Sequence, residues 1–177
     1  MSIEPLLDGH SPTEAWLATD DAARMLSDPV RRSQLYRAMH PQADAARGPL
    51  LRALLGHEVA FRTDDHFASH DEHEDRFENL YWCALLLSQI GEVQDVLALW
   101  RAKMTNFDTG CGFDVQFLVG AGVEPTLAFL TRSEDPVAPQ AAEWIKRCAE
   151  LGEFDWLDEW LAWRREYFAS SADEGSE

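Results

Sequence analysis

The stretch over residues 77–90 is apolar on nearly every side, and it constrains the fold more than any other part of the chain. Its apolar positions are Leu80, Tyr81, Trp82, Cys83, Ala84, Leu85, Leu86, Leu87 and Ile90. A helix with apolar side chains all round has to be covered by neighbouring elements. The stretch therefore predicts a central helix against which other helices pack.

Two glycine signals predict helical hairpins. Ile90-Gly91-Glu92 separates the central helix from a helix predicted over residues 93–103, because a glycine commonly follows the last turn of a helix. Leu151-Gly152-Glu153 repeats the signal between helices predicted over residues 135–151 and 154–168. A Trp-Arg pair follows each glycine, nine residues on in the first copy and eleven in the second. Irregular helical-hairpin repeats of the solenoid kind are the resulting expectation.

Capping residues and prolines place the other helices. A capping box at Ser11 to Glu14 predicts a first helix and Thr19 a second. Further helices are expected over residues 30–39, from either 44 or 48 to 61, and over residues 115–119 and 124–130. Only residues 113–119 hint at a strand, and they are few. We therefore expect an all-α fold of stacked antiparallel hairpins, HEAT/TPR-like with irregular repeats. A single domain would cover residues 1–169, followed by a disordered acidic tail over residues 170–177.

The charge balance limits the classes of partner. The chain has 15 basic and 32 acidic residues, a formal net charge of -17. Nucleic acid and anionic membrane are poor partners for such a chain. A basic protein, a cation or simple solubility remain as explanations of the negative charge, and solubility is the simplest.

Three features of the sequence bear on localisation. Residues 1–9 lack a signal-peptide pattern, and the three cysteines are an odd number. No apolar run reaches the ~20 residues that a membrane span needs, so we expect a cytoplasmic protein.

Three histidines in an acidic stretch are the candidate metal ligands. If this stretch is helical, His66 and His70 lie one turn apart, and His73 follows three residues later. Such spacing lets imidazoles share a divalent metal, although the zinc-protease pattern is absent. The alternative is a solvated acidic segment whose charges complement the start of the next helix.

The glycine-rich segment over residues 106–122 is the second candidate. Cys111 lies between two glycines, where it could be a nucleophile, but no histidine lies within 37 residues to act as its base. Asp108 and Asp114 do not follow the EF-hand calcium pattern. The simpler interpretation is structural, with Asp114 capping a short helix and Asp108 forming an Asx turn. Alternatively, this loop presents Asp108 and Asp114 to a partner.

The tryptophans of the C-terminal half are expected to lie mainly in the core. Their spacing suits packing between helices, and we expect one or two of them to contact a partner. Trp100 is the position we select as a partner contact. The others considered are Trp144, Trp156, Trp160 and Trp163.

Two resemblances extend this interpretation. The run Glu78-Asn79-Leu80-Tyr81-Trp82-Cys83, the run Trp100-Arg101-Ala102-Lys103 and residues 106–122 resemble a group of bacterial all-helical proteins that carry no assigned activity. This resemblance covers about residues 75–168 and implies no chemistry. In size, acidity and helical build the chain also resembles immunity proteins of bacterial toxin systems.

The leading functional hypothesis is a non-enzymatic, cytoplasmic helical module that binds a basic protein without a cofactor, and acts as an immunity or antitoxin protein. The competing hypothesis is a small metal-dependent hydrolase that uses His66, His70 and His73. A third is a structural domain within a larger complex.

Overall fold

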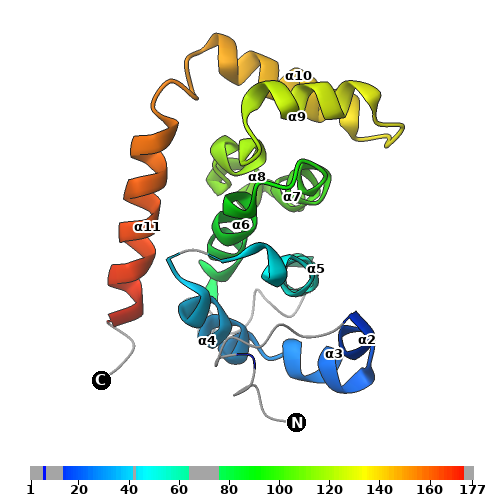
Figure 1. The fold of residues 1–177 in the computed structure, drawn as a ribbon, viewed down its shortest axis with the longest axis vertical. Helices are drawn as coiled ribbons and strands as arrows, with labels where there is room; N and C mark the ends of the chain where they lie inside the picture. The colour runs from blue at the N-terminus through cyan, green and yellow to red at the C-terminus, as the bar shows by residue number, and fades with distance from the viewer. Residues whose placement is uncertain (1–5, 7–13, 42, 64–75, 174–177) are drawn as a thin grey trace. The chain divides into compact units, whose positions relative to one another are not determined.

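The computed structural model describes residues 6, 14–41, 43–63 and 76–173. Every element of these ranges is a helix and none is a strand, which confirms the all-α prediction. The chain divides into two units, Met1–Leu86 and Leu87–Glu177. Figure 1 shows the helices of the described residues, coloured from the N-terminus to the C-terminus. The predicted single domain over residues 1–169 stays a prediction. Among the described residues, no helix combines the length and the apolar character needed to cross a membrane.

Two helices of unit 1 begin at a side chain that caps them, and one of these caps, Thr19, was predicted. Thr19 Oγ1 accepts a hydrogen bond from the Ala22 amide (3.2 Å), and Asp28 Oδ1 accepts one from the Val30 amide (2.9 Å). The capping box predicted at Ser11 lies largely outside the described residues. The elements of this unit are α2 (Glu14–Leu17), α3 (Asp20–Leu26), α4 (Pro29–Met39), η1 (Ala45–Arg47), α5 (Gly48–Thr63) and the first part of α6 (Asn79–Ile90).

A buried polar cluster joins α4 to α5 in unit 1. Arg32 is 1% exposed and Glu58 0%. Arg32 Nε donates to Glu58 Oε1 (2.7 Å), and Arg32 Nη1 donates to the Leu26 and Ser27 carbonyls (2.9 Å each). Tyr36 Oη donates to Glu58 Oε1 (2.9 Å). Because each charge has a buried partner, the cluster offsets part of the cost of removing these groups from water.

Unit 2 contains the end of α6 and six further elements. They are α7 (Asp95–Lys103), α8 (Phe107–Gly112), η4 (Val115–Val119), α9 (Val123–Arg132), α10 (Ala138–Glu150) and α11 (Leu157–Asp173). Helices α9 and α10 lie side by side (Figure 1). Helix α11 runs to Asp173, beyond the end expected at Phe168, and residues 174–177 lie outside the described residues.

Both predicted glycine turns are present. Gly91 and Gly152 have φ of 73° and 76°, the left-handed conformation that glycine adopts without steric cost. After α10, the Glu153 amide donates to the Cys148 carbonyl (3.0 Å) and the Gly152 amide to the Ala149 carbonyl (3.1 Å), which is a Schellman motif. The stacking of such hairpins into a HEAT/TPR-like array stays a prediction.

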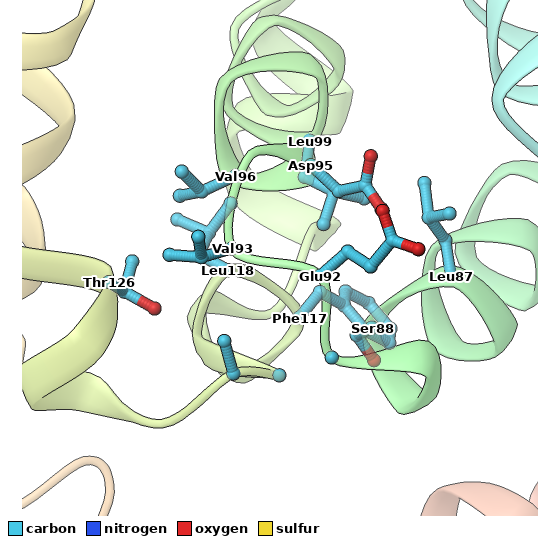
Figure 2. A pocket seen from close by; sticks show the side chains of 13 residues that line it. Leu87, Ser88, Glu92, Val93, Asp95, Val96, Leu99, Phe117, Leu118 and Thr126 are labelled. Atoms are coloured by element: carbon cyan, nitrogen blue, oxygen red, sulfur yellow. The ribbon is translucent and has the colours of Figure 1, made fainter. Parts of the chain in front are cut away.

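A close backbone approach ties the end of α6 to η4. A Cβ atom at Gly120 would lie 1.9 Å from the Ser88 carbonyl oxygen, so only glycine fits there. Figure 2 shows the neighbouring junction, where Leu99, Phe117 and Leu118 converge. The cavity at this junction has a volume of about 10 Å³, room for about one water molecule. This part of unit 2 is therefore packed tightly.

Candidate functional site

Three exposed tryptophans line one hollow on unit 2, which we call the tryptophan hollow. Trp144 of α10 is 43% exposed, Trp156 before α11 is 47% exposed, and Trp163 of α11 is 56% exposed. The hollow has a volume of about 380 Å³, within the range of about 300–1,000 Å³ typical of ligand pockets. Exposed aromatic rings gathered in this way are typical of interaction surfaces.

Asp114 forms part of the lining and connects it to α11. Its Oδ2 accepts hydrogen bonds from Arg164 Nε (2.8 Å), Arg164 Nη2 (2.5 Å) and Trp160 Nε1 (3.2 Å). The ring of Trp160 packs against Phe117, with 5.1 Å between ring centroids. Trp160, Arg164 and Phe168 recur every four residues along the buried side of α11, so Trp163 lies on another face.

Lys103 holds the segment between α7 and η4 in place. Its Nζ donates to the Gly110 carbonyl (2.7 Å) and the Phe113 carbonyl (2.8 Å), at the C-terminal end of α8, where a cation complements the helix dipole. The same Nζ lies 5.7 Å from the Trp144 ring centroid. Burial lowers the pKa of Lys103, while the negative charge of Asp114 opposes this shift.

Helix α8 arises from a capping box that the sequence analysis did not identify. The Thr109 amide donates to Asn106 Oδ1 (2.9 Å), and the Asn106 amide donates to Thr109 Oγ1 (3.0 Å). The signal was an Asn followed three residues later by a Thr. The glycines at 110 and 112 obscured it, because glycine disfavours a helix interior.

Asp114 stands at the N-cap position of η4, as expected, but its side chain makes no capping hydrogen bond. Instead, the Asp114 carboxylate accepts hydrogen bonds from the Arg164 guanidinium and the Trp160 indole of α11. The bond from the guanidinium is charge-assisted. The capping interpretation of the Asp114 side chain was therefore wrong.

The other predicted partner contacts lie apart from the hollow. Asp108 is exposed on α8 but is not part of the lining. Trp100 is 2% exposed, with its ring centroid 6.3 Å from that of Trp144, so it supports the hollow from the core. A direct contact between Trp100 and a partner stays a prediction.

The two candidate chemistries have different outcomes. His66, His70 and His73 lie outside the described residues, so the metal-site hypothesis stays a prediction. Within the described ranges, no group of three or more His, Cys, Asp or Glu side chains is placed to hold a metal ion. Cys111 is an exposed free thiol in the hollow lining, and residues 87–177 contain no histidine that could serve as its base.

Cys148, Glu153 and Lys103 also belong to the lining, and the sequence analysis gave none of them a role in a site. Burial raises the pKa of the Cys148 thiol, and the nearby charge of Glu153 acts in the same direction, so this thiol stays protonated at neutral pH. Glu153 follows Gly152 in the turn, where its backbone carbonyl accepts a hydrogen bond from Gln116 Nε2 (2.9 Å). That bond ties η4 to the turn before α11.

Two further hollows on unit 2 are weaker candidates. One, of about 210 Å³, lies beside Gln116, Leu157 and Trp160, and is smaller than a typical ligand pocket. Another, of about 510 Å³, lies between α9 and α10 and is lined by side chains of both charges without an aromatic ring. Neither has the exposed tryptophans of the tryptophan hollow.

Comparison of the chain with protein-family models, with curated proteins and with solved structures finds no match in any of the three.

Proposed function

We propose that the chain is a non-enzymatic, cytoplasmic protein-binding module whose partner is a basic protein. The single observation that supports this most strongly is the gathering of Trp144, Trp156 and Trp163, all exposed, around one hollow. Exposing three large aromatic side chains to water is unfavourable for an isolated domain, and such residues dominate binding energy where a partner covers them.

The charge of the surrounding helices selects the partner. Residues 138–173 contain eight acidic and four basic residues, and one of the basic ones, Arg164, is buried against Asp114. An acidic surface attracts a basic partner over distances of about 10 Å and repels an acidic one.

The wider role that we propose is neutralisation of that partner, as immunity proteins of toxin systems do. Helical hairpins that turn at Gly91 and Gly152 would form the scaffold, stacked irregularly in the HEAT/TPR manner. Such scaffolds present one continuous surface for binding.

The test is affinity capture of the full chain from host lysate, followed by reconstitution with the purified partner. We expect a partner of high isoelectric point that forms a stoichiometric complex, with an affinity that falls as salt rises from 50 to about 500 mM because charge attraction is screened. Recovery of acidic partners alone, or an affinity insensitive to salt, would contradict the proposal.

A further inference from the structure

We infer that the tryptophan hollow binds an arginine side chain of the partner, which its indole rings and carboxylates hold by cation–π and charge attraction. This inference rests on the proposed function, and it specifies which chemical group of the basic partner enters which site. The residues that carry it are Trp144, Trp156 and Trp163, with Glu153 in the same lining.

The rings of the hollow already attract cations of the chain itself. Lys103 Nζ lies 5.7 Å from the Trp144 ring centroid, and Arg164 Cζ lies 4.9 Å from that of Trp163. Both distances are within the ≈ 6 Å over which a cation is attracted to an aromatic face, and tryptophan is the strongest such acceptor. These rings are therefore placed in an environment that favours positive charge.

Arg164, one of these internal cations, has its charge compensated by a carboxylate. Lys103 donates to two backbone carbonyls, and Arg164 is paired with Asp114. Glu153 belongs to the lining of the hollow, and exposed acids lie near Trp156 and Trp163 in the sequence. These are Asp155, which precedes Trp156, and Glu159 and Glu166, which lie about one helical turn from Trp163.

The dimensions and chemistry favour arginine. A hollow of about 380 Å³ with three indoles at its edge suits a long side chain with a flat, weakly hydrated head. A guanidinium can stack on an indole and donate to a carboxylate at the same time, whereas an ammonium is a compact, strongly hydrated charge.

The probe is a peptide of five Gly-Arg repeats with blocked ends, titrated into the full chain by calorimetry at low salt. Its matched control replaces each arginine with citrulline, which has nearly the same shape but no charge. We expect the arginine peptide to bind at least about tenfold more tightly than the citrulline peptide, because a neutral head loses the cation–π attraction. Equal affinity for the two peptides would overturn the inference.

The variants locate the binding. Trp156→Leu with Trp163→Leu removes two rings but keeps apolar bulk, and should weaken arginine-peptide binding about tenfold. Trp156→Phe with Trp163→Phe keeps two aromatic faces and should weaken it by no more than about threefold. Phe107→Leu changes an 82% exposed ring outside the lining and should leave it unchanged. Thermal unfolding of each variant checks that its fold is retained.

The purified basic partner separates the two claims. If it binds the Trp156→Leu/Trp163→Leu variant as well as the unaltered chain, the inference about the hollow is wrong and the proposed function stands. If no basic protein binds any form of the chain, the proposed function itself is wrong. Equal loss of arginine-peptide binding in the leucine and phenylalanine variants would overturn the cation–π inference alone.

Discussion

Both units place charged side chains next to aromatic rings, but they differ in whether water reaches them. In unit 1, Arg32 and Glu58 are fully buried, and the Arg32 guanidinium lies 5.5 Å from the Phe61 ring centroid. In unit 2, Trp144, Trp156 and Trp163 are about half exposed around a hollow with Glu153 in its lining. The groups of a closed polar cluster satisfy one another and bind nothing else, whereas an open cluster leaves ring faces available to a partner.

The largest effect should come from opening the closed cluster. Glu58→Gln leaves Arg32 buried without its counter-charge, so the free energy of unfolding should fall by about 3–5 kcal/mol, measured by chemical denaturation. Asp21→Asn is the matched control, because its ion pair with Arg24 is more than half exposed and should contribute less than about 1 kcal/mol. Similar losses of unfolding free energy in both variants would show that burial does not determine how much the Arg32–Glu58 pair contributes to stability.

Gly120 tests the tight packing that lies apart from the hollow in unit 2. Gly120→Ala places a Cβ atom against the Ser88 carbonyl oxygen and should cost about 1–3 kcal/mol or more, measured by thermal unfolding. Gly56→Ala in α5 is the control, since nothing lies within 4 Å of the added atom, and it should stabilise by about 1 kcal/mol. A neutral Gly120→Ala would mean that this junction is loose.

Asp114→Asn removes the charge that pairs with Arg164 at the edge of the hollow. Because the Asp114 side chain is 29% exposed, solvent screens part of the interaction, and we expect a loss of about 1–2 kcal/mol in unfolding free energy. Urea denaturation would measure it. A loss as large as that of Glu58→Gln would show that the Asp114–Arg164 pair is shielded from water as well as the Arg32–Glu58 pair is.

Alkaline pH should weaken the closed cluster. Burial raises the pKa of Tyr36 well above its usual 10.0, with the charge of Cys83 and then Glu58 adding to the shift, and burial likewise raises the pKa of Cys83. Folded Tyr36 thus keeps a proton that the unfolded chain releases, so its contribution is intact below pH 10 and is lost as pH rises further. Above pH 10, the unfolding free energy of the unaltered chain should fall with pH, and in Tyr36→Phe this fall should be smaller by about 1.4 kcal/mol per pH unit. An unchanged slope would contradict this.

The smallest effect on stability should come from the hollow. Trp163→Ala removes a 56% exposed ring and should change the unfolding free energy by less than about 0.5 kcal/mol. Trp100→Ala, at a buried position, should cost about 3–5 kcal/mol in the same denaturation experiment. If the two variants lose comparable stability, Trp163 is part of the core and the hollow is not an open surface.

Helix positions were largely predictable because caps and glycine turns are local signals. Thr19 and Gly91 each control their own turn of backbone, and each acts as expected. Helix α8 was missed because its capping box is followed closely by two glycines, which disfavour a helix. A local pattern thus determines an element only where neighbouring residues do not oppose it.

The site was less predictable because exposure depends on contacts between distant residues. Trp100 and Trp163 both precede an arginine in similar helical contexts, yet one is buried and the other exposed. Asp114 was identified as a candidate, but its partner Arg164 lies 50 residues away, and no local pattern indicates that pairing. Arg32 and Glu58 do carry a signal, since each falls in phase with the apolar side chains of its own helix, at 35, 36 and 39 and at 51, 54 and 55.

The indole N–H signals of the seven tryptophans, followed by NMR during titration with the arginine peptide, test most directly whether binding occurs at the open hollow. We predict saturable shifts of Trp144, Trp156 and Trp163, while Trp16 and Trp82 of unit 1 stay unchanged. Shifts confined to Trp16 and Trp82, or saturable binding that leaves the three hollow signals unmoved, would contradict this assignment.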